Sequence, residues 1–212
     1  MSSRPCIPTK LKVCVICEGK EEIRYFDRLS QLNVWSGKYQ FVFKNAKSAS
    51  KIFPMFQNEY QNDSHAAILI FCDTDKFPYK EFELLKLKMN NMFNSRTSVI
   101  NKTIIFANPC TMQIILSHFG DVALTTQAKK TNGQHIKRLT GVENYDAHEE
   151  QIKTICSKIT QSNYYEMKKR VETINHDYKT TPSTNIIEFL THFENDDIKW
   201  IDSLNKSLNG KS

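Results

Sequence analysis

Over its first 120 residues the chain alternates between short apolar segments and longer amphipathic ones. Four short segments rich in β-branched residues have the composition of strands: 11–17, 39–43, 66–72 and 102–107. Four longer segments have apolar residues at helical spacing: 21–32, 48–60, 80–93 and 109–119. Three of the strands are almost continuously apolar, which is typical of strands that helices cover on both faces. The pattern therefore predicts a Rossmann-like α/β fold, with a parallel sheet between two layers of helices.

The pattern changes in the second part of the chain. Residues 127–141, QAKKTNGQHIKRLTG, are polar and basic with two glycines, and we interpret them as a loop. Helical patterns follow at three places: 146–161, 163–176 and 183–208, the last broken near 195–197. The sequence Pro-Ser-Thr at 182–184 is a typical start signal for the last of them. We expect an α/β domain over 1–125 and, over 126–212, this basic loop with an α-helical C-terminal extension packed on the domain.

Composition narrows the class of protein. The chain has 212 residues, 40% hydrophobic and 25% charged, which is ordinary for a globular domain and excludes a disordered chain. No apolar run approaches the roughly 20 residues that a membrane helix needs, and the N-terminus lacks the apolar core of a signal sequence. Of the six cysteines, Cys14 and Cys17 spell C-x-x-C, but in a strand they point to opposite faces, which argues against a zinc site. We therefore expect a protein of the reducing cytoplasm without a membrane partner.

The net charge of +6 is unevenly distributed. Residues 1–120 carry 16 Lys and Arg against 10 Asp and Glu, whereas the remaining residues carry 13 of each. A positive excess fits a polyanionic partner without requiring one. Within the predicted loop, four basic side chains are candidates for contacts with a nucleic-acid backbone, the alternative being a solvated connection. These candidates are Lys129, Lys130, Lys137 and Arg138.

Charged residues directly follow two of the predicted strands. One strand is followed by Glu18 and Lys20, and another by Asp73, Asp75 and Lys76. Ligands of open parallel sheets bind at the carboxyl ends of the strands, so these side chains are the strongest candidates for a site. Three carboxylates at one edge repel one another unless a divalent cation or lysines neutralise them. Oxygen ligands favour Mg²⁺ or Mn²⁺ over zinc.

Two interpretations of these carboxylates compete. A cation held there would polarise a phosphodiester, while a carboxylate outside the direct coordination shell moves a proton. In the alternative, Asp73 and Asp75 form an Asx turn or cap the helix that begins near Tyr79, and Glu18 is a solvated turn residue. The occurrence of both motifs at the ends of neighbouring strands favours the metal site.

The order apolar strand, Glu-Gly, helix, strand, helix, apolar strand, Asp-x-Asp resembles the TOPRIM domain of topoisomerases, bacterial primases and OLD-family nucleases. Three blocks narrow the resemblance to RloB-like proteins, a family that includes a component of the AbiL phage-exclusion system. These blocks are VCVICEGKEEIRYFDRL (13–29), NPCTMQIILSHF (108–119) and TPSTNIIEFL (181–190). They are spread over most of the chain, from residue 13 to residue 190, in the same order as in that family.

The resemblance implies roles for individual residues. Glu18 would be a general acid/base or a ligand of a second metal, and Asp73 and Asp75 would bind Mg²⁺. Lys20 and Lys76 would hold the scissile phosphate. The second block contains two further candidates for substrate contacts, Asn108 and His118.

One position departs from the family pattern. The family's second block usually carries Glu where this chain has Met112. If that Glu helps to place a metal or substrate in relatives, this chain must do without it or use another residue. Reduced metal affinity, altered substrate choice and loss of catalysis are all consistent with this departure.

The function implied by the resemblance is a Mg²⁺- or Mn²⁺-dependent nuclease, the effector of a bacterial anti-phage system. Its substrate would be RNA, such as tRNA, or DNA. No Walker A motif occurs in the chain, so an ATPase sensor or regulator would be a separate partner. A homo-oligomer is also compatible with the sequence. The alternative is a catalytically silent regulatory or nucleic-acid-binding subunit that keeps the fold, and Met112 favours it.

Overall fold

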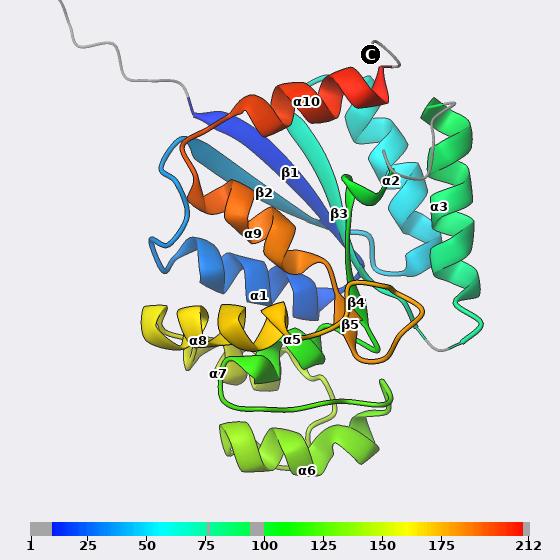
Figure 1. The fold of residues 1–212 in the computed structure, drawn as a ribbon. Coiled ribbons are helices and arrows are strands. Elements are labelled where there is room, and N and C mark those ends of the chain that lie inside the picture. Colours follow the sequence, from blue (N-terminus) through cyan, green and yellow to red (C-terminus); the bar gives the residue numbers. More distant parts are fainter. Residues whose placement is uncertain (1–9, 76, 94–99, 210–212) are drawn as a thin grey trace, which may run out of the picture.

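The computed structural model describes residues 10–75, 77–93 and 100–209, and its centre is a five-stranded sheet (Figure 1). The strand order is β2-β1-β3-β4-β5, with β1 to β4 parallel and β5 antiparallel to β4. The strands are β1 Leu11–Cys17, β2 Tyr39–Asn45, β3 Ala67–Asp73, β4 Ile104–Asn108 and β5 Ser183–Thr184. The predicted α/β class and the four parallel strands are therefore confirmed.

Helices cover both faces of the sheet (Figure 1). The described helices are α1 Lys20–Ser30, α2 Ala49–Gln61, α3 Lys80–Phe93, α5 Met112–Ser117, α6 Lys129–Thr140, α7 Glu149–Ser157, α8 Gln161–Glu172, α9 Ile186–Glu194 and α10 Lys199–Leu208. Helices α2 and α3 lie on one face, whereas α1, α5 and α7 to α10 contribute to the core on the other. The break predicted near 195–197 is confirmed, since α9 ends at Glu194 and α10 begins at Lys199.

Alternation along β1 divides the interior into two cores. Val13, Val15 and Cys17 face the larger core with α1, and Cys14 and Ile16 face the smaller one with α2 and α3. All five are fully buried, because a central strand of a three-layer fold is covered on both sides. The prediction that the two cysteines of the C-x-x-C sequence point to opposite faces is confirmed.

The prediction of a loop over 127–141 is wrong. Most of this segment forms helix α6, which ends at Gly141 in the left-handed conformation with φ 73°. The residues that α6 buries are Asn132, Ile136 and Thr140, spaced one helical turn apart. The amide of Asn132 donates to the carbonyl of Thr126, and the hydroxyl of Thr140 donates to the carbonyl of Ile136. A buried stripe with a single apolar member gives little hydrophobic periodicity, which explains the error.

The C-terminal region is joined to the sheet as well as packed on it. Ser183 and Thr184, expected to open a helix, instead form the short strand β5, and the helix begins after Asn185. The Asn185 side chain accepts from the backbone N–H of Phe106 at 2.9 Å and donates to the carbonyl of Ile104 at 2.8 Å. An asparagine that bonds both ways to β4 extends the sheet edge and fixes the start of α9. A hydrophobic core shared by α1, α7, α8 and α9 further connects the two parts of the chain.

Across the described residues, none of the helices combines the length and the apolar character needed to cross a membrane.

Candidate active site

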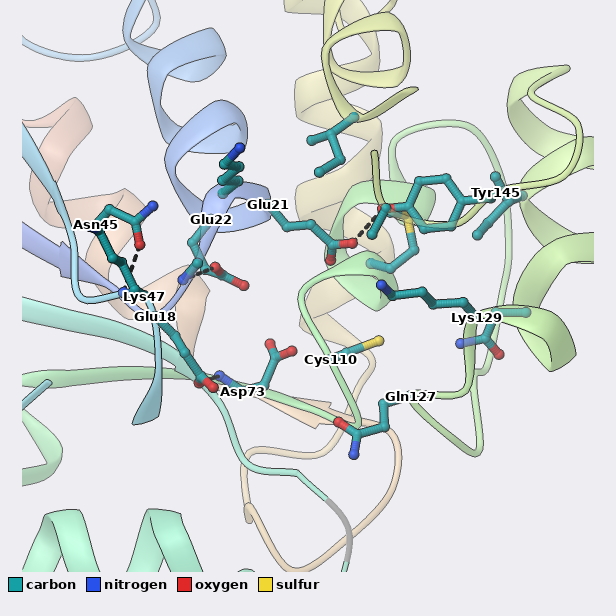
Figure 2. Close-up of a pocket in the computed structure, with 17 residues that line it drawn as sticks. Glu18, Glu21, Glu22, Asn45, Lys47, Asp73, Cys110, Gln127, Lys129 and Tyr145 are labelled. Carbon is teal, nitrogen blue, oxygen red and sulfur yellow. Dashed lines mark hydrogen bonds between the residues drawn. The ribbon is translucent and has the colours of Figure 1, made fainter. Parts of the chain in front are cut away.

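A cavity of about 520 Å³ opens at the carboxyl end of β1 and β3, where α1 begins. Four carboxylate side chains line it: Glu18, Glu21, Glu22 and Asp73. Figure 2 shows Glu18, Glu22 and Asp73 close together on one side, with Lys129 and Tyr145 on the opposite wall. The cavity therefore lies where ligands of parallel α/β sheets bind.

Two adjacent strands and one helix position these acids. Because β1 pairs directly with β3, the residues that follow them meet at one edge, and the backbone N–H of Asp73 donates to Glu18 Oε2 at 3.3 Å. Glu22 lies in the first turn of α1, where its Oε2 accepts the backbone N–H of Gly19 at 2.8 Å. A carboxylate at this position satisfies a free N–H and interacts favourably with the helix dipole. The helix start thus holds Glu22 toward Asp73.

Thr111 joins Glu22 to Asp73. Its hydroxyl lies 2.7 Å from Glu22 Oε1 and 2.8 Å from Asp73 Oδ1, and its backbone N–H donates to the same Asp73 oxygen at 2.7 Å. A threonine hydroxyl has one proton and can donate to only one of the two carboxylates. The second contact is therefore more favourable when the other carboxyl group carries a proton or when a cation binds the pair.

Burial and mutual repulsion act on all four acids. Burial, with the neighbouring Glu22 and Asp75, raises the pKa of Glu18 to about 7. Burial and Glu22 likewise raise the pKa of Glu21 to about 7. The pKa of Asp73 lies well above its usual range because it is buried beside these acids, and burial also raises the pKa of Glu22. Such a cluster holds protons near neutral pH or exchanges them for a cation.

Of the four basic candidates from the predicted loop, Lys129 is the one that lines the cavity. It extends from α6 toward the acids (Figure 2), and its charge lowers the pKa of Glu21 against the effect of burial. Its Nζ also donates to the carbonyl of Asp146 at 3.2 Å. Tyr145, from the loop after α6, donates a short hydrogen bond to Glu21. This wall of the cavity is therefore built by the segment predicted as a loop, 127–141, together with residues that follow it, such as Tyr145.

The other basic candidates lie outside the cavity or at its edge. Lys137 forms an exposed ion pair with Glu143 at 2.8 Å, Arg138 donates to the carbonyl of Asp121 at 3.5 Å, and Lys130 is exposed. Lys20 lines the cavity, but its Nζ pairs with Glu149 at 2.8 Å. Lys76 lies outside the described residues.

Two candidates from the second sequence block, Asn108 and His118, make contacts within the fold and not with the cavity. Asn108 is buried, and its amide donates to the carbonyls of Tyr178 at 2.6 Å and Thr180 at 3.1 Å. His118 is buried against Tyr25, whose hydroxyl lies 3.0 Å from its Nε2, and burial lowers the pKa of His118 to about 3. Neither residue lines the cavity. The structure therefore places both away from the acids, in the packing of the fold.

Asp75 lies beyond the end of β3 with φ 60°, close enough for its charge to raise the pKa of Glu18. It does not line the cavity. Sequence reasoning named Glu18 and Asp73 and missed Glu21 and Glu22. Both lie in the first turn of α1, directly after the strand tip that carries Glu18, and this position was the available signal.

The acids fit a hydrated cation better than a dehydrated one. Among the described residues, no three of these carboxylates each offer an oxygen within 4.8 Å of the other two. Mg²⁺ keeps several waters and binds proteins through one or two carboxylates, so it does not need three converging oxygens. The buried carboxyl pair at Thr111 and the raised pKa values are the features that a cation would relieve. The donor set is therefore compatible with Mg²⁺ or Mn²⁺.

No protein-family model, curated protein or solved structure matches this chain. The chemistry of the cavity, together with the sequence blocks described above, is consequently the basis for a functional proposal.

Proposed function

We propose that the chain is a Mg²⁺-dependent nuclease of the TOPRIM type, which hydrolyses phosphodiester bonds of RNA or DNA. The observation that carries this proposal is the group of four carboxylates in one open cavity at the carboxyl edge of a parallel sheet, facing Lys129. Carboxylate-bound cations and a nearby lysine are the usual means by which proteins neutralise a phosphate during hydrolysis. The resemblance to RloB-like proteins supports the same reaction class.

The surroundings of each residue suggest its role in cation binding, proton transfer or phosphate binding. Asp73 and Glu22, linked through Thr111, would hold Mg²⁺ or Mn²⁺, which when bound supplies charge neutralisation and polarises the phosphate. Glu18, with its pKa raised to about 7, exists in both protonation states near neutral pH. It is therefore suited to move a proton to or from the attacking water or the leaving oxygen. Lys129 would contact the substrate's phosphate.

The setting we propose is a cytoplasmic anti-phage system with a separate ATPase partner, in keeping with the RloB-like sequence blocks. The five cysteines in the described part of the chain are unpaired and buried, which suits a reducing compartment. A panel of RNA and DNA substrates incubated with Mg²⁺ or Mn²⁺ tests the activity. Cleavage that requires the cation supports the proposal; nucleic acid that stays intact in the presence of both cations, with and without an ATPase partner, contradicts it.

Replacing Glu18 by glutamine is expected to lower the cleavage rate by about 100-fold, because the residue no longer exchanges a proton. The wild-type rate should change with pH, with its midpoint below the metal-free pKa of about 7 because the bound cation favours the ionised form of Glu18, and the Glu18→Gln rate should lose this dependence. Rates measured from pH 5.5 to 8.5 check both statements. An unaltered pH profile in the variant would exclude Glu18 as the group that moves the proton.

Replacing Lys129 by alanine is expected to weaken nucleic-acid binding and to reduce the slope of log affinity against log salt by about 0.7 to 0.9. Lys137→Ala is a matched control, since it removes one charge from the same helix at a residue paired with Glu143. Binding titrations at several salt concentrations compare them. Equal effects of the two substitutions would show that Lys129 has no special contact with the substrate.

One observation favours a silent regulatory subunit as the second candidate. Met112 lines the cavity at the position where RloB-like proteins usually carry Glu. A chain that binds a cation and nucleic acid but leaves the nucleic acid uncut under all the conditions above would fit this function. Restoring the acid with Met112→Glu and measuring whether cleavage appears distinguishes a lost catalytic group from a missing partner.

A further inference from the structure

A second cluster of side chains lies on the face of the sheet covered by α2. Cys14 of β1, Glu59 of α2 and His65, which precedes β3, offer a sulfur, an oxygen and a nitrogen that all lie within 4.8 Å of one another. Cys14 is fully buried, Glu59 is 6% exposed and the His65 side chain is 8% exposed. None of the three lines the carboxylate cavity.

An ion-pair network explains only part of this cluster. Lys44 Nζ lies 2.5 Å from Glu59 Oε1, and His65 Nε2 lies 3.1 Å from Glu59 Oε2. The 3.1 Å between His65 Nε2 and Glu59 Oε2 is close to the separation of two tetrahedral zinc ligands. The network gives no role to the buried sulfur of Cys14.

We propose that Cys14, Glu59 and His65 bind a zinc ion. Thiolate, imidazole and carboxylate are the ligand types of protein zinc sites, whereas Mg²⁺ prefers oxygen alone. The Cys14 thiol would release its proton to solvent as the sulfur binds the metal. Lys44 would keep its bond to Glu59 Oε1 and orient the carboxylate, so that Oε2 faces the ion. These ligands differ from the C-x-x-C pair, because Cys17 faces the other core.

The surroundings allow an ion to enter and the ligands to close around it. A cavity of about 360 Å³ borders His65, Asp63 and Tyr60, so the cluster is approached from its His65 side, from which an ion and a water as the fourth ligand would enter. Zinc–ligand bonds of about 2.0 to 2.3 Å place tetrahedral ligands roughly 3.3 to 3.8 Å apart. Side-chain rotations that bring the donor atoms about 1 Å closer therefore suffice. The bound ion would connect α2 and the start of β3 to the central strand β1.

Zinc titration of the full chain, stripped of metal, tests this site. Asp73→Asn is used as the background so that binding at the carboxylate cavity does not obscure the result. We expect one zinc ion per chain, with affinity reduced by about 100-fold or more in Cys14→Ala and in His65→Gln. Cys72→Ala is the matched control, since Cys72 is a buried cysteine of β3 facing the same core, and it should bind zinc normally.

The absorption spectrum of the cobalt(II)-bound protein is a second measurement, which does not depend on zinc affinity. A thiolate-to-cobalt charge-transfer band should appear in the background protein and in Cys72→Ala, and should be absent from Cys14→Ala. Circular dichroism shows whether each variant folds, and if Cys14→Ala does not fold, His65→Gln and the cobalt spectrum decide. Less than one zinc ion per chain in the background protein would overturn the site. Unchanged zinc binding in folded Cys14→Ala or folded His65→Gln would do the same and leave only the Lys44–Glu59–His65 network.

Discussion

Replacing Asp73 by asparagine is expected to lower phosphodiester cleavage by about a thousandfold or more while the protein remains folded. The asparagine side chain keeps an oxygen that can accept the two Thr111 hydrogen bonds now made by Asp73 Oδ1. It removes the negative charge that a cation needs and that repels Glu18, Glu21 and Glu22. Cleavage assays and thermal melts without divalent cations measure the two effects separately.

The melts also distinguish a site residue from a helix or turn cap. Asp73→Asn should melt at the same temperature as the wild type or at a higher one. A cap would behave differently: asparagine caps about as well as aspartate, so Asp73→Asn would keep full activity and normal stability, whereas Asp73→Ala would lose about 1 kcal/mol. Asp202→Asn, at an exposed position in the first turn of α10, is a control for the same chemical change. Retained cleavage in Asp73→Asn, together with a clear loss of stability in Asp73→Ala, would remove Asp73 from the active site.

Replacing Glu18 by glutamine is expected to stabilise the metal-free protein at pH 8 and to leave its stability unchanged at pH 4. The pKa of Glu18 is about 7 in the folded protein and near 4.5 when unfolded, so folding favours its protonated form. The free energy of unfolding of the wild type therefore contains the full favourable contribution of protonated Glu18 below about pH 4.5, and this contribution is lost as the pH rises through 7. The expected gain at pH 8 is about 3 kcal/mol, or roughly 6 to 12 °C in melting temperature.

Comparing Glu18→Gln with the wild type separates the effect of Glu18 on stability from the opposite pH dependence that His118 causes. Burial lowers the pKa of His118 to about 3, so His118 destabilises the fold as the pH falls below about 6.5. That contribution is the same in both proteins and cancels in the difference. Saturating Mg²⁺ should stabilise the wild type at pH 8 and reduce the advantage of Glu18→Gln. A stability difference that does not vary between pH 4 and pH 8 would show that Glu18 is an ordinary solvated carboxylate.

The sheet and two of its acids were predictable because their signals are local. The apolar runs that end at Cys17 and Cys72 mark buried parallel strands, and the carboxyl ends of adjacent strands meet at one edge, where Glu18 and Asp73 lie. Asp75 has the same signal, but the chain turns after β3 with φ 60° at this residue, and Asp75 does not line the cavity. A backbone turn of this kind leaves little trace in the sequence.

The opposite wall of the cavity depends on contacts between distant parts of the chain. Tyr145 meets Glu21 across 124 positions, and Lys129 reaches the acids only because its segment is helical. The polar stripe of α6 carries no hydrophobic period to indicate that helix. The Cys14 cluster is equally nonlocal, because Glu59 and His65 meet the strand through the packing of α2 on the sheet. Spacing along the sequence indicates the members of such sites only when they share one element.

Manganese titration followed by electron paramagnetic resonance measures directly whether the carboxylate cavity binds a divalent cation. Titration of Mn²⁺ into the metal-free chain at pH 7.5 gives the concentration of Mn²⁺ that remains free. We expect one or two Mn²⁺ ions to bind per chain, Mg²⁺ to displace them, and Asp73→Asn to lose this binding while Asp202→Asn retains it. Equal Mn²⁺ binding by Asp73→Asn and the wild type, or no binding by either, would contradict this expectation.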